Sequence, residues 1–382
     1  MSMDKKAKKR KFAYKKKYIL IIITLFILML NLPYLINLYI TDLANHYNNK
    51  ANYITAINIQ TKLYNLDKKF LGNNEYTIIA LENLAKSELL YGNLDNAYKL
   101  YLESYYLRKN YKNIYLKIIN PFILSDFKYK NFETINSLAY LNFLISDFDN
   151  TEYYLNEALI YSRDTFGISS CQNLYQISNL LNFNAYINDK GGVDKYYKLL
   201  ITSLNNQECD EFVELTTLAK YFMYINNSNR AEKLYNKALK IKNIDECGYK
   251  ILNYDELALY YQKYDNAFKR NEYLKKGLNA KIEKYGNRHN ITAEGYLFFG
   301  YLLYKNGELE LAKNKLNENL KIQEQLLSHK HPVILCSKYY LSIMNKDYQK
   351  NKYTLNIFSS LFNKNKNISI NEFCNNYILG GK

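Results

Sequence analysis

Apolar and aromatic side chains recur at helical spacing, three or four residues apart, along most of the chain. The 382 residues include 42 Tyr but only 13 Gly and 3 Pro. That is too few turn-forming residues for a β-sandwich or barrel, which needs a turn about every 8–12 residues. Hydrophobic residues make up 48% of the chain, enough for a large core. We therefore expect an all-α protein in which the tyrosines serve mainly in packing.

Residues 18–40 break this amphipathic pattern because they contain no charged side chain. As a helix rising about 1.5 Å per residue they would reach roughly 34 Å, enough to cross a hydrocarbon core of about 30 Å. A cleaved signal peptide is the alternative, but small residues do not follow at the spacing that a signal peptidase needs. We therefore expect an uncleaved transmembrane signal-anchor helix at 18–40, with Pro33 kinking its second half.

Basic residues are concentrated just before this segment. Residues 1–17 carry nine Lys or Arg and one Asp, about half of the formal net charge of +16. By the positive-inside rule we expect a cytoplasmic N-terminus and residues 41–382 across the membrane. A bacterial inner membrane is favoured over a mitochondrial one because the leader is rich in Lys and has a single Arg. The remaining charge forms no dense basic stripe, so we expect no nucleic-acid binding.

A short pattern repeats along the rest of the chain: a pair of small or leucine residues, a turn rich in Gly, Asn and Asp, and then an alanine. The clear copies are Leu84-Ala85 with residues 92–97, Leu218-Ala219 with residues 226–231, and Gly300 with residues 307–312. Small residues are needed where two helices cross closely. This pattern resembles the tetratricopeptide repeat, a helix–turn–helix unit.

A second pattern precedes the repeats and narrows the resemblance. Residues 285–293 (YGNRHNITA) and 328–332 (SHKHP) place His289 and His331 42 residues apart, and residues 71–77 (LGNNEYT) occupy the same place earlier. Such loops are similar to those of the kinesin light chain repeat subclass. The resemblance implies a right-handed α-solenoid whose concave face, lined by the first helix of each pair, binds protein partners.

The resemblance divides the chain into five segments. They are a basic cytoplasmic tail (1–17), the anchor (18–40), a linker and leading helix (41–69), the repeat solenoid (70–365) and a frayed tail (366–382). The residues expected on the concave, partner-binding face are Asn83, Lys86, Thr217, Lys220, Tyr301, Tyr304 and Lys305. Asn83 occupies a position where the kinesin light chain subclass tends to carry an Asn that clamps a bound peptide. The equivalent positions here, Thr217, Glu256 and Phe298, break that series.

No motif for catalysis, phosphate binding or metal binding is present in the sequence. We expect no cofactor, no metal and no small-molecule substrate. Three of the four histidines, His289, His329 and His331, are expected to be loop residues of the repeats. The alternative for His329 and His331 is a metal site, which would be weak without a nearby carboxylate or Cys. Cys171, Cys209 and Cys247 recur every 38 residues, as do Cys336 and Cys374. The first three could form a disulfide in an oxidising compartment, with buried free thiols as the alternative.

These features together favour a non-enzymatic scaffold or adaptor at a membrane. It would contact the lipid bilayer through residues 18–40 and bind a protein or peptide partner through its repeats. A self-associating structural protein is one alternative. The other is a recruiting or assembly subunit of a membrane enzyme complex.

Overall fold

The computed structural model describes residues 32, 35–110, 121–204, 211–241, 249–359 and 368–380, and these residues form helices and no strands. An unlabelled helix at residues 35–49 comes first. The labelled helices are α2 (Tyr53–Leu71), α3 (Glu75–Tyr91), α4 (Leu94–Asn110), α6 (Pro121–Leu144), α7 (Phe148–Phe166), α8 (Cys171–Tyr186), α9 (Lys190–Leu204), α10 (Glu211–Tyr224), α11 (Ser228–Ala238), α12 (Tyr249–Lys263), α13 (Ala267–Tyr285), α14 (Asn290–Lys305), α15 (Leu309–Gln323), α16 (Pro332–Met344), α17 (Tyr348–Ser359) and α18 (Ile370–Gly380). The expected all-α class is confirmed.

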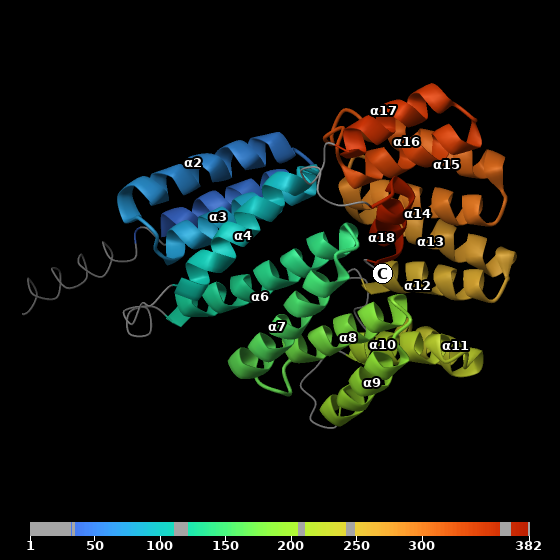
Figure 1. The fold of residues 1–382 in the computed structure, drawn as a ribbon, viewed down its shortest axis with the longest axis horizontal. Coiled ribbons are helices and arrows are strands. Elements are labelled where there is room, and N and C mark those ends of the chain that lie inside the picture. The colour runs from blue at the N-terminus through green and yellow to red at the C-terminus, as the bar shows by residue number, and fades with distance from the viewer. Residues whose placement is uncertain are drawn as a thin grey trace, which may run out of the picture.

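Consecutive helices pack as antiparallel pairs, from α3 with α4 to α16 with α17, as in an α-solenoid of tetratricopeptide-like units (Figure 1). The small residues lie at the crossings, as the sequence predicts. Ala85 and Ala97 are fully buried where α3 meets α4. At Gly300 an added methyl carbon would lie 2.7 Å from Leu316 Cγ, so the crossing of α14 and α15 admits no side chain there.

The two loop histidines begin helices. His289 Nδ1 accepts the backbone N–H of Ile291 at 3.2 Å, and His331 Nδ1 accepts that of Val333 at 3.1 Å. Each ring therefore satisfies a backbone donor that the first turn of a helix leaves without an intrahelical partner. Gly286, just before His289, has a φ of +79°, a left-handed conformation that favours glycine. The structural reading of this loop motif is confirmed.

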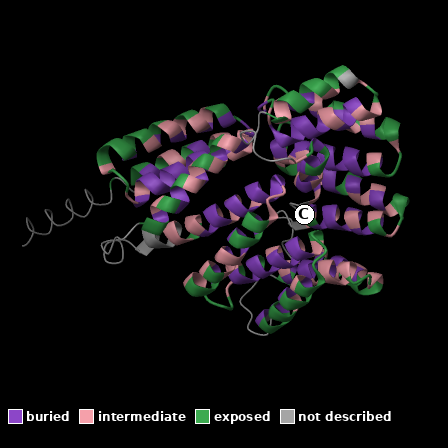
Figure 2. Ribbon diagram, in the orientation of Figure 1, coloured by how far each residue is buried: buried purple, intermediate pink, exposed green. Residues whose placement is uncertain are grey.

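The two ends of the helical array meet. The Tyr53 hydroxyl donates to Asn290 Oδ1 at 2.9 Å, and the backbone N–H of Ser328 donates to the carbonyl oxygen of Tyr91 at 3.1 Å. Figure 1 accordingly shows α2–α4 beside α14–α17, with α18 in the middle of the molecule. The buried residues lie mostly where neighbouring helices face one another (Figure 2). The solenoid is therefore wound into a closed shape and does not present one long open trough.

The expectation of a frayed tail at 366–382 is wrong for its described part. Residues 370–380 form α18, and Ile370, Phe373, Cys374 and Ile378 are each less than 5% exposed. With Tyr377, these side chains recur at the spacing of an amphipathic helix, so the segment has an apolar stripe to bury. The range 41–69, expected to hold a linker and one leading helix, contains the end of helix 35–49 and most of α2.

The expected membrane anchor falls mainly on residues outside those described. Of residues 18–40, the structure describes Leu32 and residues 35–40, and the latter open helix 35–49. No helix among the described residues combines the length and the apolar character needed to cross a membrane.

Candidate partner-binding site

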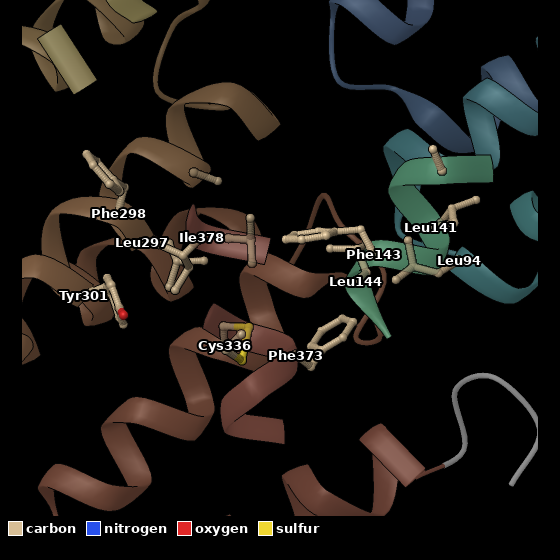
Figure 3. Close-up of a cluster of buried hydrophobic side chains, with 14 of the residues drawn as sticks. Leu94, Leu141, Phe143, Leu144, Leu297, Phe298, Tyr301, Cys336, Phe373 and Ile378 are labelled. Carbon is tan, nitrogen blue, oxygen red and sulfur yellow. A yellow bond between two sulfur atoms is a disulfide. The ribbon is translucent and has the colours of Figure 1, made fainter. Parts of the chain in front are cut away.

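The inner side of the array is filled by α18. This helix packs against α6, α14 and α16, which belong to both halves of the chain. Figure 3 shows Ile378 beside Leu297 of α14, and Phe143 of α6 pointing toward α18. Phe373 is fully buried, with its ring centroid 5.2 Å from that of Phe358 in α17. The inner side therefore forms an apolar seat for one amphipathic helix.

Tyrosine hydroxyls fix the rotation of α18 in this seat. Tyr301 of α14 and Tyr340 of α16 both donate to Asn375 Oδ1, each at 3.1 Å. Tyr377 donates in turn to Glu294 Oε1 of α14 at 2.9 Å. Because a buried polar group that loses its partner costs about 1–3 kcal/mol, these bonds disfavour any other rotation of the helix.

Asn376 joins α18 to the end of α6. Its Nδ2 donates to the carbonyl oxygens of Phe143 and Leu144, at 2.9 and 3.3 Å, and to Ser146 Oγ at 2.9 Å. Its Oδ1 accepts the hydroxyl of Tyr186 from α8. The last carbonyls of a helix have no intrahelical donor, so this fully buried amide caps α6 from a position 230 residues further along the chain.

A disulfide fastens α18 to α16. Cys336 and Cys374 are both fully buried and are bonded to each other, with their Cα atoms 5.4 Å apart. Their 38-residue spacing is visible in the sequence, but the disulfide expected there is among Cys171, Cys209 and Cys247. Cys171 is exposed at the start of α8, whereas Cys209 and Cys247 lie outside the described residues, so a disulfide among these three stays a prediction.

The side chains around α18 are held neutral. Burial raises the pKa of Tyr301 to about 12 and raises those of Tyr340 and Tyr377 further. Burial lowers the pKa of His331, whose ring lies edge-on to that of Tyr377, to about 3. Near neutral pH these tyrosines remain hydroxyl donors and His331 is uncharged. The inner side therefore offers hydroxyl donors to the amide oxygen of Asn375 and an uncharged ring to Tyr377.

Four of the seven residues predicted for the concave face connect neighbouring helices. The pairs are Asn83 Nδ2 to Thr41 Oγ1 at 3.2 Å, Lys86 Nζ to Glu133 Oε1 at 3.5 Å, Thr217 Oγ1 to Ser178 Oγ at 2.7 Å, and Lys220 Nζ to Glu256 Oε1 at 2.9 Å. The first helices of neighbouring pairs lie close together in the wound array. Side chains on the predicted concave face therefore contact the first helix of an adjacent pair. Asn83 and Thr217 are buried, so they are not available to a partner in this state.

The remaining three lie on α14. Tyr301 is buried against α18, and Tyr304 packs on the ring of Tyr340 at 5.2 Å between centroids. Lys305 is exposed, with its Nζ 6.0 Å from the ring centroid of Tyr301. The structure therefore brings Tyr301 and Tyr304 to the α18 seat and places the other predicted residues elsewhere along the array.

Asn375 and Asn376, which make the most specific contacts of α18, are not among the residues predicted from the sequence. Their signal was present in the apolar spacing of residues 370–378, which predicts an amphipathic helix with these amides beside its stripe. No three His, Cys, Asp or Glu side chains in the described part of the chain gather as a metal site.

Comparisons with known proteins add little. No protein-family model matches the chain, and no curated protein matches it with significance. Among solved structures, the chain is similar to the crystal structure of BtubC (BKLC) from P. vanneervenii, at 13% identity and a TM-score of 0.25. The alignment covers 82% of this chain and 93% of that chain. This similarity is too low to assign a fold family or a function. The fold and the candidate site are therefore described from the contacts within this chain alone.

Proposed function

We propose that the protein is a membrane-tethered interaction scaffold that holds a helical segment of a partner protein on its inner side. The observation that carries the proposal is the binding of α18 itself. Helices α6, α8, α14 and α16 supply an apolar seat and converging hydroxyl and carbonyl groups for a single helix. The step from a helical-repeat fold to protein binding is a fold-level analogy, and we assign no catalytic role.

In this proposal α18 is a resident occupant that a partner helix replaces. Residues 360–369 separate α17 from α18 along the chain, and α18 is the last helix that the structure describes. The Cys336–Cys374 disulfide holds α18 in position, so a partner helix can enter only after thiol–disulfide exchange with a dithiol protein of its compartment has opened the bond. A partner helix would carry apolar residues at the α18 spacing and a small amide where Asn376 lies.

The tether in this proposal is the uncharged run at residues 18–40, preceded by the basic residues 1–17. A N-terminus in the cytoplasm places the repeats on the far side of the membrane. The Cys336–Cys374 disulfide supports that orientation, because stable disulfides are rare in reducing cytosol and persist in oxidising compartments.

A peptide-binding measurement on the full chain tests the proposal. Cys374→Ser combined with Phe373→Asp removes the disulfide and places a charge in the apolar seat, which releases α18. We expect a labelled peptide of residues 368–380 to bind this variant and to be excluded by the oxidised wild-type chain. A peptide carrying Asn376→Leu is the matched control, and we expect it to bind at least about tenfold more weakly because it leaves buried carbonyls without a donor.

The released chain must first show an unchanged helical circular dichroism spectrum. If it is folded and still fails to bind the peptide, the inner side is not a partner site. If the variant instead sediments as a dimer that the peptide does not dissociate, the protein is a self-associating structural protein and the scaffold proposal is wrong.

A further inference from the structure

The first helical hairpin exposes an unusual number of apolar side chains at one end. The hairpin consists of helix 35–49 and α2, joined at residues 50–52. Only a narrow face of the first helix is buried, represented by Asn37, Ala44 and Asn48. The rest of that helix near its start is open to solvent.

Five exposed side chains form what we call the hairpin patch: Leu35 (48% exposed), Ile36 (46%), Tyr39 (70%), Leu66 (51%) and Phe70 (70%). Single exposed apolar residues are ordinary, but a cluster of them marks an interaction surface. Within the described part of the chain these side chains face solvent, and α2 lies apart from α18 (Figure 1).

The register of the hairpin explains where this patch would lie. Asn37 Nδ2 donates to Asp67 Oδ1 at 3.4 Å, and helices joined by a short turn run antiparallel. Leu66 and Phe70, on either side of Asp67 in α2, therefore lie near residues 35–39 of the first helix. Residues 35–39 belong to the end of the uncharged run, which stops at Ile40.

Lysines flank the patch. Lys68 and Lys69 are exposed beside Phe70, and Lys69 Nζ lies 5.4 Å from the Phe70 ring centroid. Long cationic side chains can cover apolar surface with their stems while their charge stays in water or among headgroups. Each lysine near an anionic surface contributes about 1 kcal/mol of attraction. Aromatic rings such as those of Tyr39 and Phe70, with lysines beside them, suit the boundary between headgroups and acyl chains.

We propose that the hairpin patch sits in the headgroup–acyl boundary of an anionic bilayer and so fixes the orientation of the whole array on the membrane. This inference rests on the tether in the proposed function, because residues 18–40 bring the patch to the bilayer. It goes beyond the tether by adding α2, which is separate from the uncharged run, to the membrane contact. A single tether would leave the array free to change its orientation relative to the membrane. Contact through both the tether and the hairpin patch would hold one side of the array against the lipid.

The chain contains no Trp, so a single introduced indole reports its surroundings without background. We would place Phe70→Trp in the full chain, reconstituted in vesicles of phosphatidylglycerol and phosphatidylcholine whose acyl chains carry bromine. Phe268→Trp on α13 is the matched control, since Phe268 is 82% exposed and lies outside the hairpin. We expect bromolipid to quench most of the emission of the Phe70→Trp variant and to leave the Phe268→Trp variant unchanged.

Flotation of the same vesicles separates the two claims. If the Phe70→Trp chain floats with the vesicles but its emission is unquenched, the chain is bound to the membrane but the hairpin patch does not contact lipid. The patch then faces solvent or a protein partner, and the inference is overturned. If the chain does not float, both the tether and the membrane-facing patch are wrong. Quenching that is equal in the two variants would show non-specific adsorption and would also overturn it.

Discussion

Gly92, which ends α3, lies directly against His331, which begins α16. A methyl carbon added to Gly92 would lie 2.5 Å from the Cα atom of His331 and 2.7 Å from its ring carbon Cδ2. The two residues belong to opposite ends of the array, so this contact is part of its closure. The backbones of Gly92 and His331 approach so closely that only the hydrogen atom of a glycine fits between them.

Gly92→Ala should therefore destabilise the closed array more than a turn substitution elsewhere. Gly92 has a φ of +94°, which costs a non-glycine residue about 1–2 kcal/mol, and the clash with His331 adds about 1–3 kcal/mol. Gly307→Ala is the matched control, since Gly307 has a φ of +79° and no neighbour within 4 Å of the added carbon. Chemical unfolding of both variants measures the difference, and equal losses would contradict the closure.

The buried ion pair between Arg108 and Glu82 ties α3 to α4. Both side chains are less than 5% exposed, and Glu82 also accepts from Ser104 and Thr134. Arg108→Met leaves this carboxylate buried without its cation, and we expect a loss of about 3–5 kcal/mol in unfolding free energy.

The exposed pair of Lys276 with Glu272 supplies the comparison for that substitution. Both side chains are more than 40% exposed, so Lys276→Met should cost no more than about 0.5 kcal/mol. A loss for Arg108→Met as small as this would mean that Glu82 and Arg108 are solvated in solution.

His331 should make the fold sensitive to acid. Burial lowers its pKa to about 3 in the folded chain, whereas an unfolded His titrates near pH 6.5. Below about pH 6.5 the unfolded chain binds a proton that the folded chain does not, so stability present above that pH is lost as the pH falls toward 3. The loss approaches about 1.4 kcal/mol per pH unit for this one group.

His331→Asn isolates that contribution, because Asn can still cap α16 but does not titrate. We expect the unfolding free energy of the wild-type chain to fall more steeply between pH 6 and pH 4 than that of the variant. Parallel curves would show that His331 is protonated, or accessible to water, in the folded state.

Local rules predicted the helix pairs well. The crossing at Gly300 follows from side-chain size, and the helix starts at His289 and His331 follow from capping chemistry, which depends on residues close in sequence. The all-α class and the packing role of the tyrosines could be predicted for the same reason.

The closure could not be predicted in this way. The contact between Tyr91 and Ser328 depends on small rotations added over every intervening repeat, and no local pattern records their sum. Whether Asn83 and Thr217 are exposed depends on the same winding. The helix spacing in the sequence places them on the concave face, but it does not show that neighbouring helices bury them there. A position at the chain end favours fraying of the tail near Gly380, but the apolar spacing of residues 370–378 indicates a helix, and the structure has one there.

Mapping the disulfides of the full-length chain tests most directly whether α18 is seated against α16 on the inner side of the array. The protein would be digested without reductant, and its linked peptides identified by mass spectrometry. The account predicts one linkage between the peptide containing Cys336 and the peptide containing Cys374, within a single chain and lost on reduction. Cys374 found as a free thiol, joined to another cysteine, or joined to Cys336 of a second copy would contradict this placement of α18 within one chain.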